Sequence, residues 1–395
     1  MSINEEDIVI VGAKRTAIGA FQGQFRELSA PRLGSVAIEA AIRQAGLNPT
    51  TIDEDILGCC LPAGLGQAPA RQAVLGAGLA HTVPATTISK MCGSGMKAVM
   101  LAHDLLRCGT AKVAIAGGME SMSNAPYLLP KARQGLRMGH SQVIDHMFFD
   151  GLQDAYEGKL MGCYADASAG DWNLTREAQD SYASESIRRA QHAITNGVFE
   201  AEIAPVPIVD KKGSHSLGRD ETPEQCNLEK VPSLRPAVVA DGTVTAANSS
   251  SISDGAAAMV LMRADSALAA GLTPLARIAS HATHALAPAK FTEAPAGAIR
   301  KVLERAGWSE THVDLYEINE AFAAVTMIAI SDLGLDPERV NVNGGACALG
   351  HPIGASGARI LVTLLYALRV RNVRRGVASL CLGGGEATAV AIELV

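Results

Sequence analysis

Short, continuous runs of apolar residues alternate along this chain with longer stretches in which apolar residues recur every three or four positions. The runs at 8–12, 56–61 and 113–118 are typical of strands that are buried on both faces. A helical pattern covers 31–45 and stops at Gly46, a residue that favours the left-handed conformation at a helix end. Strands that alternate with helices in this way predict an α/β fold, with a parallel sheet covered by helices.

The pattern changes between 119 and 248. Loops, charged stretches and one polar amphipathic helix over 176–196 replace the regular alternation there. Buried-strand character returns at 256–262, and we expect this strand to rejoin the first sheet. The segment 119–248 is therefore predicted to be an inserted loop domain, and 1–118 with 249–272 form one half of the fold.

The remaining segment, 273–395, repeats the order of elements found in the first half. Gly95 and Gly357 each open a predicted helix, and each helix is followed by a strand that ends in glycine, at Gly117 and Gly383. The same order in both halves indicates a duplication, with two similar domains related by a pseudo-two-fold axis. Strand ends and helix starts from both halves then meet, and ligand sites favour such junctions.

The composition is that of an ordinary globular protein. Of 395 residues, 48% are hydrophobic and 19% charged, and no apolar run reaches the ~18–20 residues that span a bilayer. The net charge of −6 gives no indication of a nucleic-acid partner. The acidic start of the chain resembles neither a secretory signal nor a transit peptide. The eight cysteines show no CxxC pair and no metal-ligand spacing, which predicts a cytoplasmic protein with free thiols and no metal site.

Cys92 lies between a short apolar run and a predicted helix. A thiol at a helix N-terminus is close to unpaired N–H groups and to the positive end of the helix dipole, so we expect it to lose its proton more readily. His351 lies in the equivalent turn of the second half, and a cysteine–histidine pair can transfer an acyl group through a thiolate nucleophile. Taken alone, Cys92 also fits a core residue and His351 also fits a turn cap.

Cys381 and Asn319 end two predicted strands of the second half. Simple hydrolysis does not need a second cysteine, but the Cys381 thiolate could move a carbon-bound proton, which implies carbon–carbon bond chemistry on a thioester. Asn319 can hold a water or polarise an oxygen, and the backbone N–H groups of Cys92 and Gly383 can stabilise an oxyanion. Taken alone, Cys381 also fits a small core residue, and Asn319 also fits a helix cap.

Five motifs resemble those of the thiolases, in the same order and over essentially the whole chain. They are MCGSG at 91–95, AGGMESMS at 116–123, NEAFA at 319–323, GHPIGASG at 350–357 and CLGGG at 381–385. The resemblance implies a duplicated five-layer αβαβα sandwich of two five-stranded halves, with 119–248 as a loop domain that binds coenzyme A. It also implies an acyltransferase that binds no cofactor tightly and uses coenzyme A as substrate and product. Its expected partners are acyl-CoA molecules and further copies of itself in a homotetramer, without nucleic acid or membrane.

The resemblance also assigns roles to individual residues. Cys92 is the nucleophile that accepts the acyl group, and Cys381 is the acid/base that deprotonates the second acyl-CoA at its α-carbon. His351 activates Cys92 and, with a water held by Asn319, forms one oxyanion hole. The N–H groups of Cys92 and Gly383 form the other. The positions that match substrate- and CoA-binding residues are Ser250 at the pantetheine arm and Leu152, Met161, Ala246, Ala321 and Phe322 around the pocket.

Several positions depart from the family pattern. Glu386 follows the last glycines, and its carboxylate would raise the pKa of Cys381 if it pointed inward. Leu160 stands where short-chain members often carry a histidine, and the acidic segment 220–224 stands where an arginine facing CoA is common. Phe291 replaces a common methionine and resembles the version that accepts a 2-methyl branch.

The stretches 91–100 and 119–124 look most like the short-chain group of the family. This implies acetyl-CoA C-acetyltransferase activity, a reversible ping-pong condensation of two acetyl-CoA to acetoacetyl-CoA and CoA. The alternative within the family is a degradative 3-ketoacyl-CoA thiolase of fatty-acid β-oxidation. A non-catalytic acyl-CoA- or lipid-binding homologue would need the loss of Cys92, His351 or Cys381, and carrier-protein condensing enzymes typically lack a second catalytic cysteine. The sequence therefore favours a thiolase.

Overall fold

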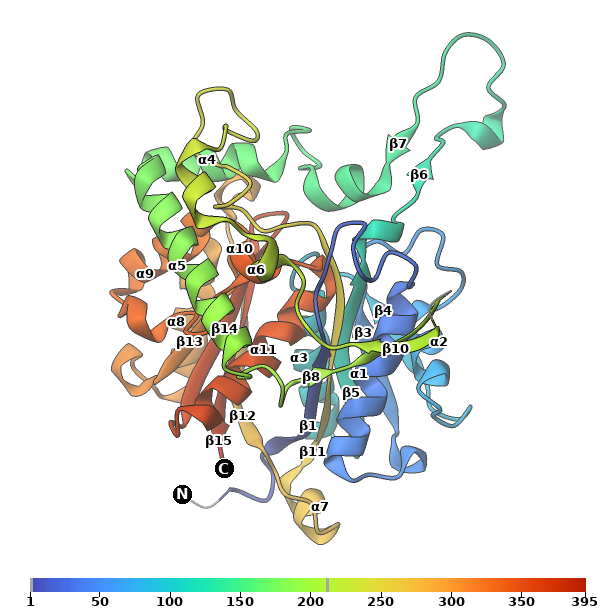
Figure 1. Cartoon of the computed structure of the whole chain (residues 1–395). Coiled ribbons are helices and arrows are strands. Elements are labelled where there is room, and N and C mark those ends of the chain that lie inside the picture. Colours follow the sequence, from blue (N-terminus) through green and yellow to red (C-terminus); the bar gives the residue numbers. More distant parts are fainter. Residues whose placement is uncertain (1–2, 211–212) are drawn as a thin grey trace.

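The computed structural model describes residues 3–210 and 213–395 (Figure 1). One path of hydrogen-bonded strands runs through it in the order β13-β14-β15-β12-β1-β11-β5-β3-β4. This path divides into two half-sheets between β12 and β1, which share only the residue pairs Val9–Arg277 and Ile10–Ala276. The duplicated halves are thus joined by hydrogen bonds at one corner.

Five strands of this path form the first half-sheet, which is mixed, so the prediction of a parallel sheet is wrong for it. Both β1 and β5 run antiparallel to β11, whereas β3 runs parallel to β5 and β4. The whole of β5 is buried, as its continuous apolar run predicts. The pairing of β11 with β5 confirms that the chain returns to this sheet after the predicted insertion. The strands are β1 (Ile8–Thr16), β11 (Ser253–Arg263), β5 (Val113–Ser121), β3 (Glu54–Gly58) and β4 (Ala85–Ile88).

The second half-sheet contains four strands: β12 (Ala276–Ala285), β15 (Glu386–Leu394), β14 (Arg375–Leu382) and β13 (Leu315–Ile318). Where the resemblance predicted a fifth strand, a single parallel bridge joins Tyr316 to Val340. Asn341 has a φ of 47°, which turns the chain away from the sheet. Its side chain binds both the N–H and the carbonyl of Ile318, which keeps this turn at the end of β13.

Helices form three layers around the half-sheets, as the predicted sandwich requires (Figure 1). α3 and α11 lie between the half-sheets, α1 and α2 cover the outer side of the first, and α8 covers the second with α9 packed against it. α1 ends at Gly46, which has a φ of 70°, as predicted. The bounds are α1 (Ala30–Ala45), α2 (Pro69–Gly76), α3 (Ser94–Arg107), α8 (Ala294–Ala306), α9 (Ala323–Leu333) and α11 (Ile353–Val370).

α11 begins at Ile353, four residues before Gly357, which was predicted to open it. The glycines of 350–357 suggested a turn, but tertiary contact explains two of them. A Cβ on Gly357 would lie 2.5 Å from the backbone N of Met96, and one on Gly95 would lie 2.9 Å from that of Ala358. These equivalent glycines therefore let α3 and α11 meet backbone to backbone at their first turns.

α11 is also, among the described residues, the one helix that is long and apolar enough to cross a membrane by length and composition. However, 89% of its apolar window is buried inside the protein. It lies between the two half-sheets, and its contacts with α3 explain its apolar character.

One part of the segment between β5 and β11, with α4, lies over one end of the half-sheets, and another part, with α5, β8 and β10, runs across their side (Figure 1). The segment also includes the hairpin of β6 and β7, which projects from the body of the molecule at the upper right. The predicted amphipathic helix is present as α5. The elements of this segment are β6 (Tyr127–Leu128), β7 (Ile144–Asp145), α4 (Met161–Asp171), α5 (Arg176–Thr195), β8 (Ile203–Ala204), β9 (Val206–Asp210), β10 (Gly213–Leu217) and α6 (Thr222–Gln225). Elsewhere lie β2 (Gly19–Ala20), α7 (Ala264–Ala269) and α10 (Ala346–Leu349).

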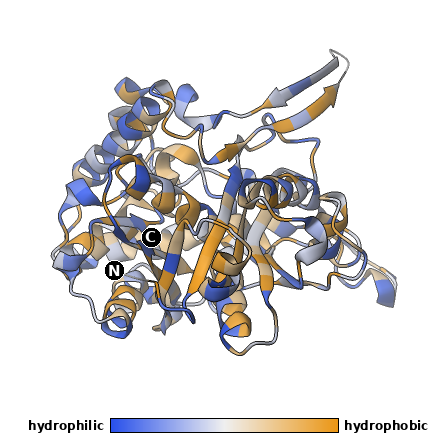
Figure 2. Ribbon diagram, turned by 90° about the horizontal axis from the view of Figure 1, so that it is seen from below, coloured by the Kyte–Doolittle hydropathy of each residue, from blue (hydrophilic) through white to orange (hydrophobic). Residues whose placement is uncertain are grey.

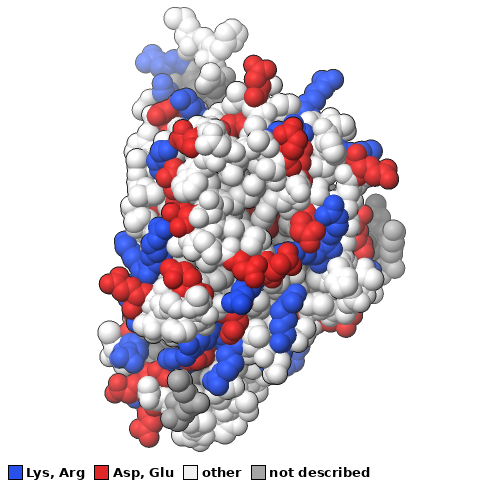
Figure 3. All heavy atoms as spheres, turned by 90° about the vertical axis from the view of Figure 1, so that its left-hand side faces the viewer, with Lys and Arg blue, Asp and Glu red and all other residues white. Residues whose placement is uncertain are grey.

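The distribution of side chains follows this layering. Hydrophobic residues concentrate in the strands at the centre of the molecule, and the outer helices carry many hydrophilic ones (Figure 2). On the face shown in Figure 3, basic and acidic side chains are interspersed over the whole surface. That face has no extended region of one charge.

Candidate active site

A cavity of about 220 Å³ lies where the two halves and the inserted segment meet. Cys92 reaches it from the turn before α3, His351 from the turn before α11, and Cys381 from the end of β14. The duplication predicted this meeting of helix starts and strand ends. Because α3 and α11 cross at Gly95 and Gly357, the two turns that carry Cys92 and His351 are brought to the same place.

The lining of the cavity is mostly apolar and contains nearly all the predicted binding residues. Ala246 is the exception, because its side chain is exposed and lies outside the cavity. It belongs to a turn that is closed by a hydrogen bond of 2.7 Å from the N–H of Thr245 to Oδ1 of Asn248. Leu160 also lines the cavity. The predicted residues that line it are Cys92, His351, Cys381, Gly383, Ser250, Leu152, Met161, Ala321, Phe322 and Phe291. Residues of the lining that the sequence did not reveal include Met122, Phe148, Val238, Ser249 and Ile353.

The Cys92 thiol is held by a strained turn. Met91 has a φ of 46°, which is uncommon for a residue with a side chain. The Ser94 hydroxyl fixes this turn, since it donates to the carbonyl of Met91 at 2.6 Å and accepts the N–H of Lys90 at 2.8 Å. A Cβ on Gly93 would lie 2.5 Å from Leu382, so the turn lies directly against the end of β14.

The expectation that Cys92 is readily deprotonated is wrong for the free protein. Burial raises the pKa of Cys92 to about 11, although hydrogen bonds from the N–H groups of Gly383 and Cys92 lower it. The apolar lining therefore outweighs the polar groups at the helix start. The thiol carries its proton at neutral pH and needs a base to become a nucleophile.

His351 has the properties of that base. It is 5% exposed, and burial together with the charge of Arg359 lowers its pKa to about 3, so the imidazole is neutral at pH 7. Its Nδ1 lies 2.6 Å from the Ser356 hydroxyl, which can donate its hydrogen to the carbonyl of Pro352 at 2.9 Å. Ser356 then accepts from Nδ1–H, and we assign the free lone pair to Nε2. Among the described residues Nε2 is buried without a hydrogen-bond partner, as a base that acts on a neighbouring thiol requires.

Asn319 lies on the Nδ1 side of His351 and does not line the cavity. Its Nδ2 is 3.5 Å from Nδ1, and its Oδ1 is 3.5 Å from Nη2 of the buried Arg359. Arg359 in turn lies 3.7 Å from Glu317, whose pKa burial raises to about 8. The structure thus places Asn319 within a buried polar group next to His351, and the predicted water at Asn319 stays a prediction.

Cys381 is 1% exposed and packs against Phe291, Ala321 and Tyr164. Burial, and then the proximity of Cys92, raise the pKa of the Cys381 thiol well above its ordinary value. The expected influence of Glu386 is absent, because its carboxylate forms an ion pair with Lys90. Both cavity thiols are therefore protonated in the free protein, and their apolar surroundings are the cause.

Residues 8–265 match the thiolase N-terminal domain, and residues 272–394 match the thiolase C-terminal domain. The chain belongs to the thiolase family. An acetyl-CoA acetyltransferase of Escherichia coli is 51% identical over 390 residues, which cover 98% of this chain and 99% of that protein. One of Pseudomonas aeruginosa is 49% identical over 389 residues, with the same coverage.

Two solved structures confirm the fold. The crystal structure of a thiolase from Ascaris suum in complex with coenzyme A aligns with a TM-score of 0.93 and 42% identity, over 99% of this chain and 100% of that one. An acetyl-CoA acetyltransferase from Syntrophomonas wolfei aligns with a TM-score of 0.96 and 38% identity, over the same shares.

Two buried carboxylates of this thiolase support the site, although the sequence analysis gave them no role. Glu120 accepts hydrogen bonds from the N–H groups of Cys60 and Gly354 at 2.9 Å, so it ties the first half to the start of α11. Glu320 accepts from Ser186 at 2.7 Å and from the N–H of Cys347 at 3.0 Å, and so holds α5 against the second half. Both lie inside motifs that identified the family. A carboxylate within an apolar motif was the signal that could have revealed them.

The acidic segment 220–224 does not line the cavity of this thiolase. Asp220 forms a buried ion pair with Arg15, and Glu221 accepts the N–H groups of Ala20 and Gln24 at 2.9 Å. The acidic residues at these two positions are therefore used to fasten the insertion to β1 and β2.

Proposed function

We propose that this thiolase is an acetyl-CoA C-acetyltransferase, which reversibly condenses two acetyl-CoA to acetoacetyl-CoA and CoA. The observation that carries the proposal is the meeting of Cys92, His351 and Cys381 at one apolar cavity. Relatives named acetyl-CoA acetyltransferase, about half identical over nearly the full chain, support the acetyl specificity. The coenzyme A complex of the Ascaris suum thiolase supports CoA as substrate and product.

The first half of the proposed reaction forms an acetyl-enzyme. His351 Nε2 takes the proton of the Cys92 thiol, and the thiolate attacks the carbonyl carbon of acetyl-CoA. The N–H groups of Cys92 and Gly383 stabilise the negative oxygen that forms. The tetrahedral intermediate then expels the CoA thiolate, which takes the proton of Cys381 and leaves as CoA.

The second half forms the carbon–carbon bond. The Cys381 thiolate removes a proton from the methyl group of a second acetyl-CoA, and the imidazolium of His351 stabilises the enolate oxygen with the predicted water at Asn319. The enolate carbon attacks the acetyl group on Cys92. Cys92 leaves as a thiolate and recovers its proton from His351, so all three residues return to their starting forms.

The surroundings of the two thiols favour short acyl groups. Phe291 and Phe322 meet edge to face, with their ring centroids 6.2 Å apart, and both belong to the apolar cluster that contains Cys381. These rings and Met161 line the cavity beside the thiols, so the acyl group would lie against bulky apolar side chains. This apolar wall at the thiols supports the short-chain proposal over the degradative alternative.

Thiolysis by the purified protein tests the proposal. The substrates are acetoacetyl-CoA, its 2-methyl form and 3-ketohexadecanoyl-CoA, each with CoA, and a Cys92→Ser variant is compared with Cys108→Ser, which alters an exposed cysteine. We expect turnover of acetoacetyl-CoA, retained in Cys108→Ser and lost in Cys92→Ser. Turnover of the 2-methyl form would link Phe291 to branch tolerance. Preference for the long chain would support the degradative alternative, and inactivity on all three would support a binding protein.

We also propose that the protein is a cytoplasmic homotetramer. Eight free cysteines agree with a reducing compartment. The projecting β6–β7 hairpin carries exposed apolar side chains at Tyr127, Leu129, Leu136, Met138 and Val143, which a second copy of the chain could cover. Light scattering of the purified protein should give the mass of four chains. The mass of one chain would contradict the proposal.

A further inference from the structure

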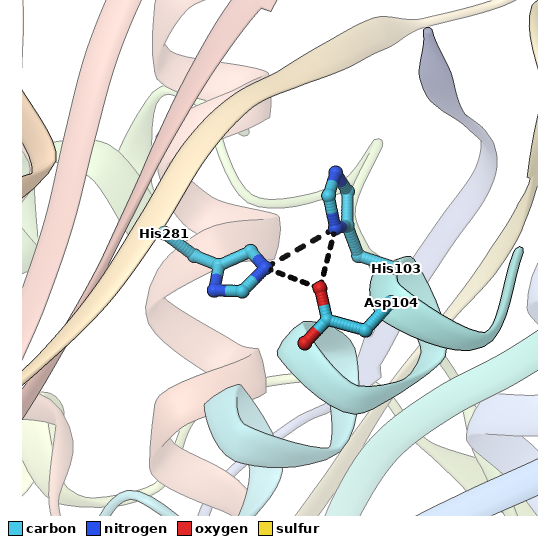
Figure 4. Close-up of side chains that lie close together, drawn as sticks. All are labelled: His103, Asp104 and His281. Atoms are coloured by element: carbon cyan, nitrogen blue, oxygen red, sulfur yellow. Dashed lines mark hydrogen bonds and ion pairs between the residues drawn. The ribbon is translucent and has the colours of Figure 1, made fainter. Parts of the chain in front are cut away.

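His103, Asp104 and His281 lie together at the far end of α3 from Cys92 (Figure 4). His103 and Asp104 belong to the last turns of α3, and His281 projects from β12 of the second half. The helix rises about 1.5 Å per residue, so this cluster is about 18 Å along α3 from the catalytic turn. It is a separate site from the cavity.

The three side chains point one donor atom each toward a common centre. Nδ1 of His103 lies 3.1 Å from Oδ1 of Asp104, and Nε2 of His281 lies 3.0 Å from the same oxygen. The two ring nitrogens are 3.1 Å apart, and the rings meet edge to face. The donor atoms therefore form a nearly equilateral triangle (Figure 4).

Hydrogen bonds cannot satisfy all three sides of this triangle while both imidazoles are neutral. The carboxylate oxygen only accepts, and each of the two ring nitrogens either donates or accepts. If both rings donate to Asp104, two N–H groups face each other. If one ring accepts from the other, its lone pair faces the carboxylate. Each arrangement leaves one repulsive contact, whereas a cation at the centre would attract all three lone pairs.

We propose that His103, Asp104 and His281 bind a divalent transition-metal cation of the Zn²⁺ type. Two imidazoles and a carboxylate are ligands that Zn²⁺ accepts, with metal–ligand bonds of about 2.0–2.2 Å. Tetrahedral bonds of that length separate the donor atoms by about 3.3–3.6 Å. The side chain of Asp104 is half-exposed, so it can move outward by the few tenths of an ångström that this requires.

A metal here would connect the two halves of the fold. The ligands come from a central helix of the first half and from the strand β12 that joins the half-sheets. The site would therefore act as a cross-link between halves, far from the reacting thiols. The ligands His103 and His281 are 178 residues apart, which explains why ligand spacing in the sequence predicts no metal site.

Cobalt binding to the intact, metal-free protein tests the proposal. We expect one Co²⁺ per chain, with visible absorption bands but no thiolate-to-cobalt band in the ultraviolet, because no cysteine is a ligand. His103→Asn, His281→Asn and Asp104→Asn should each weaken binding by at least about tenfold. His284→Asn, three residues along the same strand and outside the cluster, should leave it unchanged.

Thermal unfolding with and without Zn²⁺ gives a second readout. The cation should raise the Tm of the wild type and of His284→Asn, but not that of Asp104→Asn. Asp104 is half-exposed at its side chain, so this variant keeps the test decisive even if a histidine variant does not fold. Equal cobalt affinity in the wild type and Asp104→Asn, or a thiolate band, would overturn the proposal.

Discussion

The central helices of the two halves carry the same pair of residues near their starts, and each half uses the pair differently. Ser94-Gly95 opens α3, whereas Ser356-Gly357 are the fourth and fifth residues of α11. In both places the glycine admits the other helix. In the first half the serine hydroxyl fixes a strained peptide turn. In the second half it contacts an imidazole.

This difference separates what the duplication provides from what the reaction needs. The shared glycines bring the helix starts together, and that contact is nearly symmetric. The chemistry is asymmetric, since one turn presents the Cys92 thiol and the other presents the neutral His351 base. The duplicated fold therefore brings the starts of the two central helices together. The different residues in the two preceding turns make this junction a reactive site.

Substitutions of the two cysteines should have the largest effects, and they should affect the two steps of the reaction differently. Cys92→Ala should lower the rate of acetyl-enzyme formation by about 10³-fold or more, because it removes the nucleophile. Cys381→Ala should lower that rate only about tenfold, since the imidazolium can replace it as the acid, but should lower condensation by about 10³-fold. Mass spectrometry of the acetylated protein and an acetoacetyl-CoA assay measure the two steps. Equal loss of acetylation in both variants would contradict the division of roles.

The serine beside His351 should affect catalysis through the imidazole alone. Ser356→Ala should lower kcat about 10- to 100-fold, because the ring loses the group that places its proton on Nδ1. In a His351→Asn background the same substitution should have almost no further effect. Steady-state kinetics of the two single variants and the double variant give this coupling directly. Additive losses would show that Ser356 acts independently of His351.

Alanine substitutions on either side of the contact between α3 and α11 should lower the stability of the protein by similar amounts. Gly95→Ala and Gly357→Ala should each destabilise the protein by about 1–3 kcal/mol, because the added methyl group enters the backbone of the other helix. Gly170→Ala is the matched control, since Gly170 lies in α4 with no atom within 4 Å of the added carbon. It should be neutral or slightly stabilising. Urea unfolding followed by circular dichroism measures all three. A stability for Gly357→Ala equal to that of the control would exclude the close contact.

Much of this fold could be predicted from local pattern. Continuous apolar runs gave β1 and β5 because strands buried on both faces need no polar residues, and Gly46 marked the end of α1. β15 was missed, since it follows a hairpin turn in which Gly384 and Gly385 have φ of 93° and 86°. The start of α11 was also missed, because its glycines serve a contact with a distant helix.

The sequence predicted which residues form the candidate site better than it predicted their protonation and their ion pairs. Cys92, His351 and Cys381 could be found because motifs and duplication place them at helix starts and strand ends. The pKa of Cys92 was expected to fall, but it depends on the apolar lining that several distant segments supply. The ion pair of Glu386 with Lys90 likewise depends on tertiary placement. Charges and burial across the fold are properties that a local pattern does not contain.

The central claim is that Cys92 is a protonated thiol that a neutral His351 activates only when substrate is attacked. The most direct test is the ultraviolet absorbance of thiolate as a function of pH, taken as the difference between the wild type and Cys92→Ser. The claim predicts no difference from Cys92 at pH 7, with thiolate appearing only toward pH 11, near the raised pKa of this thiol. A Cys92 thiolate already present at pH 7 would contradict the claim and indicate a thiolate–imidazolium pair in the free enzyme.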